Sequence, residues 1–395
     1  MILIISFNAR QIAYLAKQIG LEIAIVDFWG DLDLFPLSNK IYTVFKPEFK
    51  SYTKFSDQTQ NEDLLCNLAF QAISNDPIEG VLIGSGWDDR PDLWEKINHT
   101  VPIYGNSPEC IRIVRDLSAV QKVLKEERIK VPLTISAADS TEVMEFVMQV
   151  GFPIVIKPLK TLGGIGIQLL KTKSELIEFL NKNSENLNKY YVQEYISGDN
   201  ISTTMVGNGK KYEVLSINEQ LIGIKEFGTN IPFKYCGNIV PFNCSPEIAQ
   251  IIEKNSLTIA KAFNLRGIFG IDFVLKNKIP YFMEINPRFP GTIELLAMVS
   301  QLNAVKLHLD AMRGTIPIEI SEVRGYAMKS VLFAKKRFVT KNLGTIPHLV
   351  DIPQPNITLD PEEPICSIQL FDESREQLLK RMAFYVKQMY FKVEP

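Results

Sequence analysis

The N-terminal part of the chain alternates short apolar runs with helical patterns. Met1 to Ser6 and Leu21 to Val26 are continuous apolar runs, typical of strands buried on both faces of a parallel sheet. Between them, Gln11 to Ile19 carries apolar residues at helical spacing, and Gly80 to Ile83 and Val101 to Tyr104 repeat the strand pattern. This order predicts right-handed β-α-β units and therefore an α/β domain.

Beyond residue 110 the apolar runs favour an antiparallel sheet. Phe152 to Ile156, Ile201 to Val206 and Tyr212 to Ile217 read as strands. Gly325 to Ala334 and the run CSIQLF predict two more strands, followed by a long helix from Ser374. We therefore expect an α/β domain over residues 1–110, a central α+β domain over 111–315 and a C-terminal α+β unit over 316–395. Within the central domain, a small subdomain covers about 130–195 and a larger part covers 196–315.

The segment Gly267 to Pro290 predicts a β-hairpin that carries acid and amide side chains. Its two apolar runs are joined by the mostly polar Lys276 to Ile279. Glu284 and Asn286 lie two residues apart on the second strand and therefore share a face. Asp272 on the first strand joins them only if the loop has an odd number of residues, about three, because a slip of one residue turns it to the other face.

These side chains form a candidate metal site. Like charges directly opposite each other destabilise a sheet, and a divalent cation between Asp272 and Glu284 would remove the repulsion. The oxygen-only set of Asp272, Glu284 and Asn286 suits Mg²⁺ (or Mn²⁺), which takes its remaining ligands from water and nucleotide phosphates. Arg288 follows closely and could face a phosphoryl group or a substrate carboxylate. The alternative is a solvated hairpin face with ordinary surface charges.

Composition restricts the classes of function. The chain has 395 residues, more than one typical core holds, and a formal net charge of −2, so no basic surface recruits nucleic acid or an anionic membrane. Five cysteines without CxxC spacing indicate reduced thiols in a cytoplasmic protein. No His/Cys cluster suggests zinc, and the lone His308 and His348 read as structural. No apolar run reaches the ~20 residues that a membrane-spanning helix needs.

A glycine-rich turn follows a lysine at the end of a strand. Lys157 ends the strand that begins at Phe152, and TLGGIG (Thr161 to Gly166) precedes another strand, Ile167 to Leu170. Glycines let the backbone approach a phosphate, successive N–H groups can bind an anion, and Lys157 supplies a positive charge. The pattern is not a Walker A loop, and a plain turn is the alternative.

Two further stretches complete the candidate site. Tyr190 to Ile196 is an apolar strand that carries Gln193 and Glu194, and such a segment can offer backbone groups and a carboxylate to an adenine. Gly223 to Pro241 is polar and aperiodic, and we interpret it as a mobile loop near the site.

The loops after the N-terminal strands are candidates for a small-substrate pocket, because ligands of open α/β sheets bind beyond the carboxyl ends of strands. These loops are Ser6 to Arg10 and Gly84 to Asp88. Arg10 and Arg90 would suit a carboxylate such as that of an amino acid. Turn glycines around a buried Trp87 are the equally open alternative. The SFNAR turn lacks the glycines of GxGxxG, so a dinucleotide site is rejected.

In their order and spacing, the segments from about Ser107 to Met312 resemble the ATP-grasp superfamily. The motifs that match are Lys157-Pro158 with Gly163-Gly164-Ile165-Gly166, Val192 to Gly198, Gly270-Ile271-Asp272-Phe273 and Glu284-Ile285-Asn286-Pro287-Arg288. Tyr235 to Pro241 and the tail from Asp351 to Cys366 resemble the branch of carboxylases and carboxylate–amine ligases related to biotin carboxylase. The resemblance implies a Rossmann-like pre-ATP-grasp domain, a two-subdomain ATP-grasp module and a small C-terminal α+β unit.

The resemblance also implies roles for individual residues. ATP would lie between two subdomains, and Mg²⁺ would be held by Asp272, Glu284 and Asn286. The implied catalytic residues are Arg288, Lys157 and Asn286, and the implied nucleotide-binding residues are Lys122, Lys157, Gly163, Gly164, Gln193, Glu194, Tyr195, Ile196 and Asp199.

Two positions depart from the family pattern. The family often has an Asp-Lys pair where this chain has Asp116-Leu117, and Lys122 would substitute for the lysine. An acid often meets the ribose where this chain has Asn200, with Asp199 beside it.

The reaction implied by the resemblance is ADP-forming ligation of a carboxylate to an amine through an acylphosphate. An amino acid is the favoured substrate, Glu294 is the candidate base, and a homodimer is compatible with the resemblance. Two alternatives stay open: an ATP-dependent carboxylase that uses bicarbonate, and a non-catalytic ATP-binding module.

Overall fold

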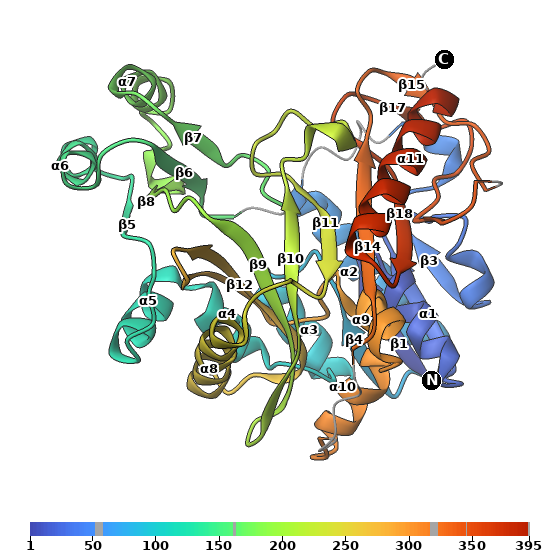
Figure 1. The fold of residues 1–395 in the computed structure, drawn as a ribbon. Helices are drawn as coiled ribbons and strands as arrows, with labels where there is room; N and C mark the ends of the chain where they lie inside the picture. The colour runs from blue at the N-terminus through green and yellow to red at the C-terminus, as the bar shows by residue number, and fades with distance from the viewer. Residues whose placement is uncertain (52–57, 161–162, 317–322, 345, 394–395) are drawn as a thin grey trace.

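The computed structural model describes residues 1–51, 58–160, 163–316, 323–344 and 346–393 (Figure 1). Thr161 and Leu162, the first residues of the predicted glycine turn, lie outside the described residues. The elements form three main sheets and one two-stranded ribbon, β15 (Phe338–Val339) with β17 (Thr358–Leu359).

The N-terminal residues form a parallel four-stranded sheet in the order β3-β2-β1-β4. Its strands are β1 (Ile2–Ser6), β2 (Ile23–Asp27), β3 (Ile41–Thr43) and β4 (Gly80–Ile83), and its helices are α1 (Arg10–Gln18), α2 (Gln58–Asn75) and α3 (Pro91–Thr100). Every residue of β2 and β4 is buried, which explains the continuous apolar runs. The strand predicted at Val101 to Tyr104 is reduced to one bridge between Val81 and Ile103.

A small antiparallel sheet follows, in the order β5-β8-β6-β7. Its strands are β5 (Thr134–Ser136), β6 (Ile154–Pro158), β7 (Gln168–Leu170) and β8 (Tyr190–Glu194), and it is reached through α4 (Pro108–Arg115) and α5 (Leu117–Glu126). In Figure 1 its helices α6 (Ser140–Val150) and α7 (Lys173–Lys182) lie on the outer side of the sheet. Apolar side chains from both helices and the strands form a separate core.

The largest sheet has eight strands in the order β13-β12-β9-β10-β11-β14-β18-β16. They are β9 (Asp199–Asn208), β10 (Tyr212–Ile222), β11 (Tyr235–Val240), β12 (Arg266–Lys276), β13 (Ile279–Asn286), β14 (Tyr326–Phe333), β16 (Leu349–Val350) and β18 (Pro364–Asp372). The accompanying helices are α8 (Pro246–Ala262), α9 (Ile293–Ser300), α10 (Ala304–Met312) and α11 (Arg375–Val393). Strands on both sides of the boundary expected near residue 315 therefore share one sheet. The segment Gly223 to Pro241, which we interpreted as a loop, contains β11.

The hairpin of β12 and β13 reaches the expected register by an unexpected route. Lys276 pairs with Ile279, so the turn has two residues, both with positive φ, and the expected odd-numbered loop is wrong. Asp272 nevertheless pairs with Glu284, because a β-bulge leaves Met283 without a partner between the pairs Asp272–Glu284 and Phe273–Phe282. The bulge supplies the extra residue that the turn lacks.

The loop after β2 packs against a segment near the C-terminal part of the chain. In Figure 1 the N-terminal (blue) and C-terminal (red) regions lie side by side. The backbone N–H of Leu32 donates to the carbonyl of Ile352 at 2.7 Å, and Gln354 Nε2 donates to the carbonyl of Gly30 at 2.9 Å. These contacts bring the loop after β2 beside the segment that follows β16. Among the described helices, none combines the length and the apolar character required to cross a bilayer.

Candidate active site

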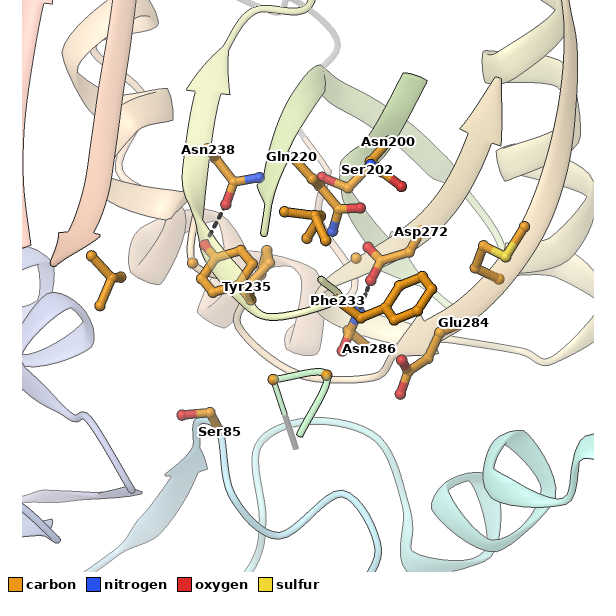
Figure 2. Close-up of a pocket in the computed structure, with 18 of the residues that line it drawn as sticks. Ser85, Asn200, Ser202, Gln220, Phe233, Tyr235, Asn238, Asp272, Glu284 and Asn286 are labelled. Carbon is orange, nitrogen blue, oxygen red and sulfur yellow. Dashed lines mark hydrogen bonds between the residues drawn. The ribbon is translucent and has the colours of Figure 1, made fainter. Parts of the chain in front are cut away.

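A cavity of about 740 Å³ takes lining residues from all three main sheets or the loops beside them. Ser85 follows β4, Lys157 lies on β6 of the small sheet, and Asp272 lies on β12 of the large sheet. The volume lies within the range of cavities that hold a small organic ligand or cofactor. In Figure 2 Ser85 lies across the cavity from the side chains of the hairpin.

The three candidate metal ligands are together in this cavity. Asn286 Nδ2 donates to Asp272 Oδ2 at 3.0 Å, and Figure 2 shows Glu284 beside this pair. Burial, together with the charge of Glu284 opposite, raises the pKa of Asp272 to about 7. The pKa of Glu284 is instead lowered, because the charges of Arg115 and Lys157 outweigh the effect of its burial.

The residues present fit a magnesium ion. Burial is the main cause of the raised pKa of Asp272, and the charge of Glu284 is the second; a divalent cation would remove the repulsion between the two carboxylates. No group of three or more His, Cys, Asp or Glu residues among the described positions could hold a metal. The candidate set of Asp272, Glu284 and Asn286 is smaller than such a group: it offers two carboxylates and one amide oxygen, which suits Mg²⁺ when phosphates supply further ligands.

Two arginines flank these oxygens and are held by the loop after β4. Arg115, the last residue of α4, pairs with Glu284, and its Nε donates to Asp89 Oδ1 at 2.7 Å. Arg288 Nε donates to Asp88 Oδ1 at 2.9 Å, and its Nη2 donates to Asn286 Oδ1 at 3.2 Å. The loop predicted to contact substrate thus also positions two cations beside the candidate metal ligands.

The glycine turn contacts a distant part of the chain. Lys157 and both Gly163 and Gly164 line the cavity. The backbone N–H of Tyr235 donates to the carbonyl of Gly163 at 3.1 Å. Gly164 has φ +80°, and a Cβ there would lie 1.9 Å from the carbonyl oxygen of Phe233, so only glycine permits this approach. The two segments predicted to cover the site therefore pack against each other.

The predicted adenine segment connects the small sheet to the large one. Gln193, Glu194, Tyr195 and Ile196 all line the cavity between the end of β8 and the start of β9. The Gln193 side chain donates to Thr134 Oγ1 at 2.9 Å, and Glu194 Oε2 accepts from the backbone N–H of Leu133 at 3.3 Å. These contacts fix the strand end and present the following backbone to the cavity.

Two predicted nucleotide-binding residues lie elsewhere. Lys122 is exposed on α5 and is not among the cavity-lining residues, whereas Arg115, one residue before Asp116, lines the cavity. Asp199 lines a second, smaller cavity, and its neighbour Asn200 lines the main one. Near the start of the central domain, the basic residue that reaches the cavity is therefore Arg115 rather than Lys122.

Two predictions are wrong: that Arg10 and Arg90 bind a substrate carboxylate, and that Glu294 acts as the base. Arg10 is 4% exposed and already paired: its Nη1 donates to Glu294 Oε1 at 2.9 Å and its Nε to Asp351 Oδ1 at 2.8 Å. Arg90 Nη2 donates to Asp63 Oδ1 at 2.9 Å and to Asp92 Oδ2 at 2.9 Å. Neither guanidinium is available to a substrate, and Glu294 is an ion-pair partner rather than a base.

Sequence reasoning missed several polar residues of the cavity. Ser202 on β9 and Gln220 on β10 lie near Asp272 (Figure 2). The side chain of Gln220 acts to lower the pKa of Asp272, against the effect of burial. Tyr235 donates to Asn238 Oδ1 on β11. The available signal was alternation: Asn200 directly precedes the strand predicted at Ile201 to Val206, and it lies two residues before Ser202, on the same face if the strand begins earlier.

Comparisons with known proteins agree with this architecture. Residues 114–292 match the ATP-grasp domain family. The chain is 26% identical over 375 residues to an uncharacterized protein of Methanocaldococcus jannaschii, covering 93% of this chain and 87% of that protein.

Two solved structures share the fold. One is a biotin carboxylase from Campylobacter jejuni (TM-score 0.75, 15% identity, 96% of this chain and 89% of that chain). The other is N5-carboxyaminoimidazole ribonucleotide synthetase from Thermus thermophilus (TM-score 0.71, 14% identity, 100% of this chain and 99% of that chain).

The central part of the chain, residues 114–292, therefore belongs to the ATP-grasp class of domain, and the chain shares its overall fold with a carboxylase and a synthetase. The chain carries an ATP-grasp domain, so the resemblance inferred from the motifs and the mixed α/β architecture are both confirmed. ATP and Mg²⁺ are the cofactors of this class.

Proposed function

We propose that the protein is an ADP-forming ligase that joins a carboxylate to an amine through an acylphosphate, with an amino acid as one substrate. The observation that carries this proposal is the pairing of Asp272 with Glu284, beside Asn286, in a cavity also lined by Lys157 and the glycine turn. A binding module would need a nucleotide-sized cavity but not a cluster of metal-binding oxygens next to two positioned arginines.

The proposed roles follow from the geometry. Lys157 carries a charge that no described residue pairs at ion-pair distance, and it would neutralise phosphate oxygens across from Glu284. Arg288, held by Asp88, would stabilise negative charge on the transferring phosphoryl group. A bound Mg²⁺ would supply further neutralisation of the phosphate charge. Asp272, Glu284 and Asn286 would hold it.

The second step, attack of an amine on the acylphosphate, depends on position and on exclusion of water. Holding both reactants in one cavity can contribute about 7–11 kcal/mol in favourable cases. The turn at Gly163 and Gly164, packed on Phe233, would cover the phosphates and limit hydrolysis.

A second candidate is a carboxylase that uses bicarbonate, which the fold similarity to a biotin carboxylase favours. Both candidates would begin with phosphoryl transfer to a carboxylate-like oxyanion. The deciding experiment incubates the full chain with ATP, Mg²⁺ and an amino-acid panel, with and without bicarbonate, and measures ADP. We expect ADP release that requires an added amine; release that requires bicarbonate instead would favour the carboxylase, and ATP binding without any turnover would favour the binding module.

Replacement of Glu284 by Ala tests the metal assignment. ATP turnover should be abolished, because one of the two carboxylates is lost, while Arg115 keeps Asp89 as a partner and the fold is retained. Glu213→Ala on β10, outside the cavity lining, is the control and should retain turnover. Full turnover by Glu284→Ala, with an unchanged circular dichroism spectrum, would contradict the assignment.

A further inference from the structure

A second group of polar and aromatic residues lines the same cavity away from the candidate metal ligands. We call this group the acidic end; it consists of Phe7, Asn8, Gln11, Trp29, Asp31, Lys329 and Asp351. Lys329 lies on β14, and three strands separate β14 from β12, which carries Asp272. At the usual strand spacing, the two strands are about 19 Å apart.

Negative charge exceeds positive charge at the acidic end. Asp27, Asp31, Asp33, Asp351 and Glu294 lie around two cations, Arg10 and Lys329. Both cations are already paired, since Arg10 contacts three of the carboxylates and Lys329 Nζ lies 2.7 Å from Asp351 Oδ2. Uncompensated charge in a buried site is costly, so this arrangement favours one more positive charge.

Asp31 is the carboxylate that lacks a partner. It is 8% exposed and lines the cavity, and no described residue donates a hydrogen bond to its side chain. Its neighbours are satisfied: Asp27 accepts from the backbone N–H groups of Ala9 and Gly30, and Asp33 accepts from those of Asp351 and Ile352. Burial and the adjacent carboxylates raise the pKa of Asp31 well above its usual value.

Two amide oxygens of residues that line the same cavity as Asp31 also lack donors among the described residues. Asn8 Oδ1 and Gln11 Oε1 are buried, and neither accepts a hydrogen bond from the described residues. An unsatisfied buried acceptor costs about 1–3 kcal/mol, so a ligand with several N–H donors would be stabilised here. The aromatic rings of Phe7 and Trp29 line the same cavity and suit an organic cation.

We propose that the acidic end binds a protonated amino group of a substrate, such as the α-ammonium of an amino acid or the terminal ammonium of a diamine. Asp31 supplies the charge, and Asn8 and Gln11 accept two of the N–H donors. This ammonium anchors the substrate and is not the attacking amine, since a nucleophilic nitrogen must be unprotonated. The inference rests on the proposed function only in naming the ligand a substrate.

The test compares ligands that differ by one ammonium group. Lysine with norleucine, glutamate with glutarate, leucine with isocaproate, and putrescine with butylamine are titrated by calorimetry into the full chain without nucleotide. We expect at least one ammonium-bearing compound to bind about tenfold or more tightly than its partner, equivalent to about 1.4 kcal/mol. Asp31→Asn should remove that preference.

Controls separate this inference from the proposed function. Asp139→Asn makes the same change at an exposed N-cap of α6, where Asn also caps well, and should leave the preference intact. Binding of a non-hydrolysable ATP analogue with Mg²⁺ should be unchanged in Asp31→Asn. Failure of the analogue to bind the unmodified chain would overturn the proposed function alone. Absence of any ammonium preference, or its persistence in Asp31→Asn with an unchanged melting temperature, would overturn the ammonium site.

Discussion

The two ends of the cavity use buried charge in opposite ways. One end carries Asp272, Glu284 and Asn286; we propose that it holds the nucleotide and call it the nucleotide end. There Asp272 and Glu284 pair across one hairpin, Arg115 contacts Glu284, and Arg288 donates to Asn286. Next to the acidic end, a single cation, Arg10, contacts three carboxylates: Asp33, Asp351 and Glu294. These carboxylates come from three separate segments of the chain. The first arrangement gathers oxygens and cations at the cavity wall, whereas the second joins the N-terminal sheet to the large sheet.

This difference predicts where a substitution is felt. Residues that line the cavity at the nucleotide end should affect turnover more than stability, as proposed for Glu284. Residues whose charge is consumed by internal pairs should affect stability first. Asp31 is the exception at the acidic end, since its carboxylate lacks a hydrogen-bond donor among the described residues.

Replacement of Arg10 by Met should produce the largest effect. Arg10 is 4% exposed, and its loss leaves several buried carboxylates with Lys329 as the remaining cation. Removal of one partner of a buried ion pair costs about 3–5 kcal/mol, so the free energy of unfolding should fall by that amount. Urea denaturation followed by circular dichroism measures it.

Arg112→Met is the matched control for Arg10→Met. Arg112 pairs with Glu95 and Glu109 on the surface, and its side chain is 42% exposed. Such pairs contribute about 0–1 kcal/mol. Equal stability losses in the two variants would mean that the acidic end does not join the sheets as described.

The nucleotide end was largely predictable from the sequence because its parts are local. Glu284 and Asn286 lie two residues apart, and the hairpin brings Asp272 across from them within one short segment. The route was not predictable, since a two-residue turn and a bulge at Met283 together produce the register. An alternating pattern predicts which face of a strand a side chain occupies. It does not predict the length of the turn or the position of a β-bulge, which together set the register.

The acidic end was not predictable because it is assembled from distant segments. Asp31 follows β2 and Asp351 follows β16, and only tertiary packing brings them together. The same cause explains the error at Arg10, which the sequence presents as an isolated loop cation. Asp33 and Asp351, its buried partners, could not be inferred from local spacing.

Lowering the pH tests two buried residues, His308 and Asp27, whose pKa values burial shifts in opposite directions. His308 is 3% exposed; its Nδ1 accepts from the backbone N–H of Ile268 at 2.8 Å, and its Nε2 lies 2.7 Å from the carbonyl oxygen of Tyr104, to which it donates. Burial lowers the pKa of His308 to about 4 from 6.5. The unfolded chain therefore binds the proton first as pH falls, and this contribution to stability, about 3 kcal/mol, is present above pH 6.5 and lost between about pH 6.5 and 4.

Asp27 has the opposite effect on folding stability over nearly the same pH range. Burial raises its pKa to about 7, so the folded chain binds that proton first and gains stability as pH falls from about 7 to 4. We expect His308→Gln to be less stable at neutral pH, with the difference from the unmodified chain shrinking by about 3 kcal/mol towards pH 4. Urea denaturation at several pH values measures this difference; a constant difference would mean that His308 does not titrate on unfolding.

The smallest predicted effect concerns the close backbone approach that covers the nucleotide end. Gly164→Ala would place a Cβ 1.9 Å from the carbonyl oxygen of Phe233, so the turn should be displaced from the segment that carries Tyr235. We expect about tenfold weaker binding of an ATP analogue, because backbone N–H groups of the turn would no longer reach the phosphates.

Gly163→Ala is the matched control: its φ is also positive, at +60°, but a Cβ there meets no atom within 4 Å. Both variants carry the strain of a left-handed alanine, so the difference between their affinities isolates the contact with Phe233. Equal affinities would show that the turn does not need this contact to bind phosphate, and the nucleotide end would then depend on side chains alone, as the acidic end does.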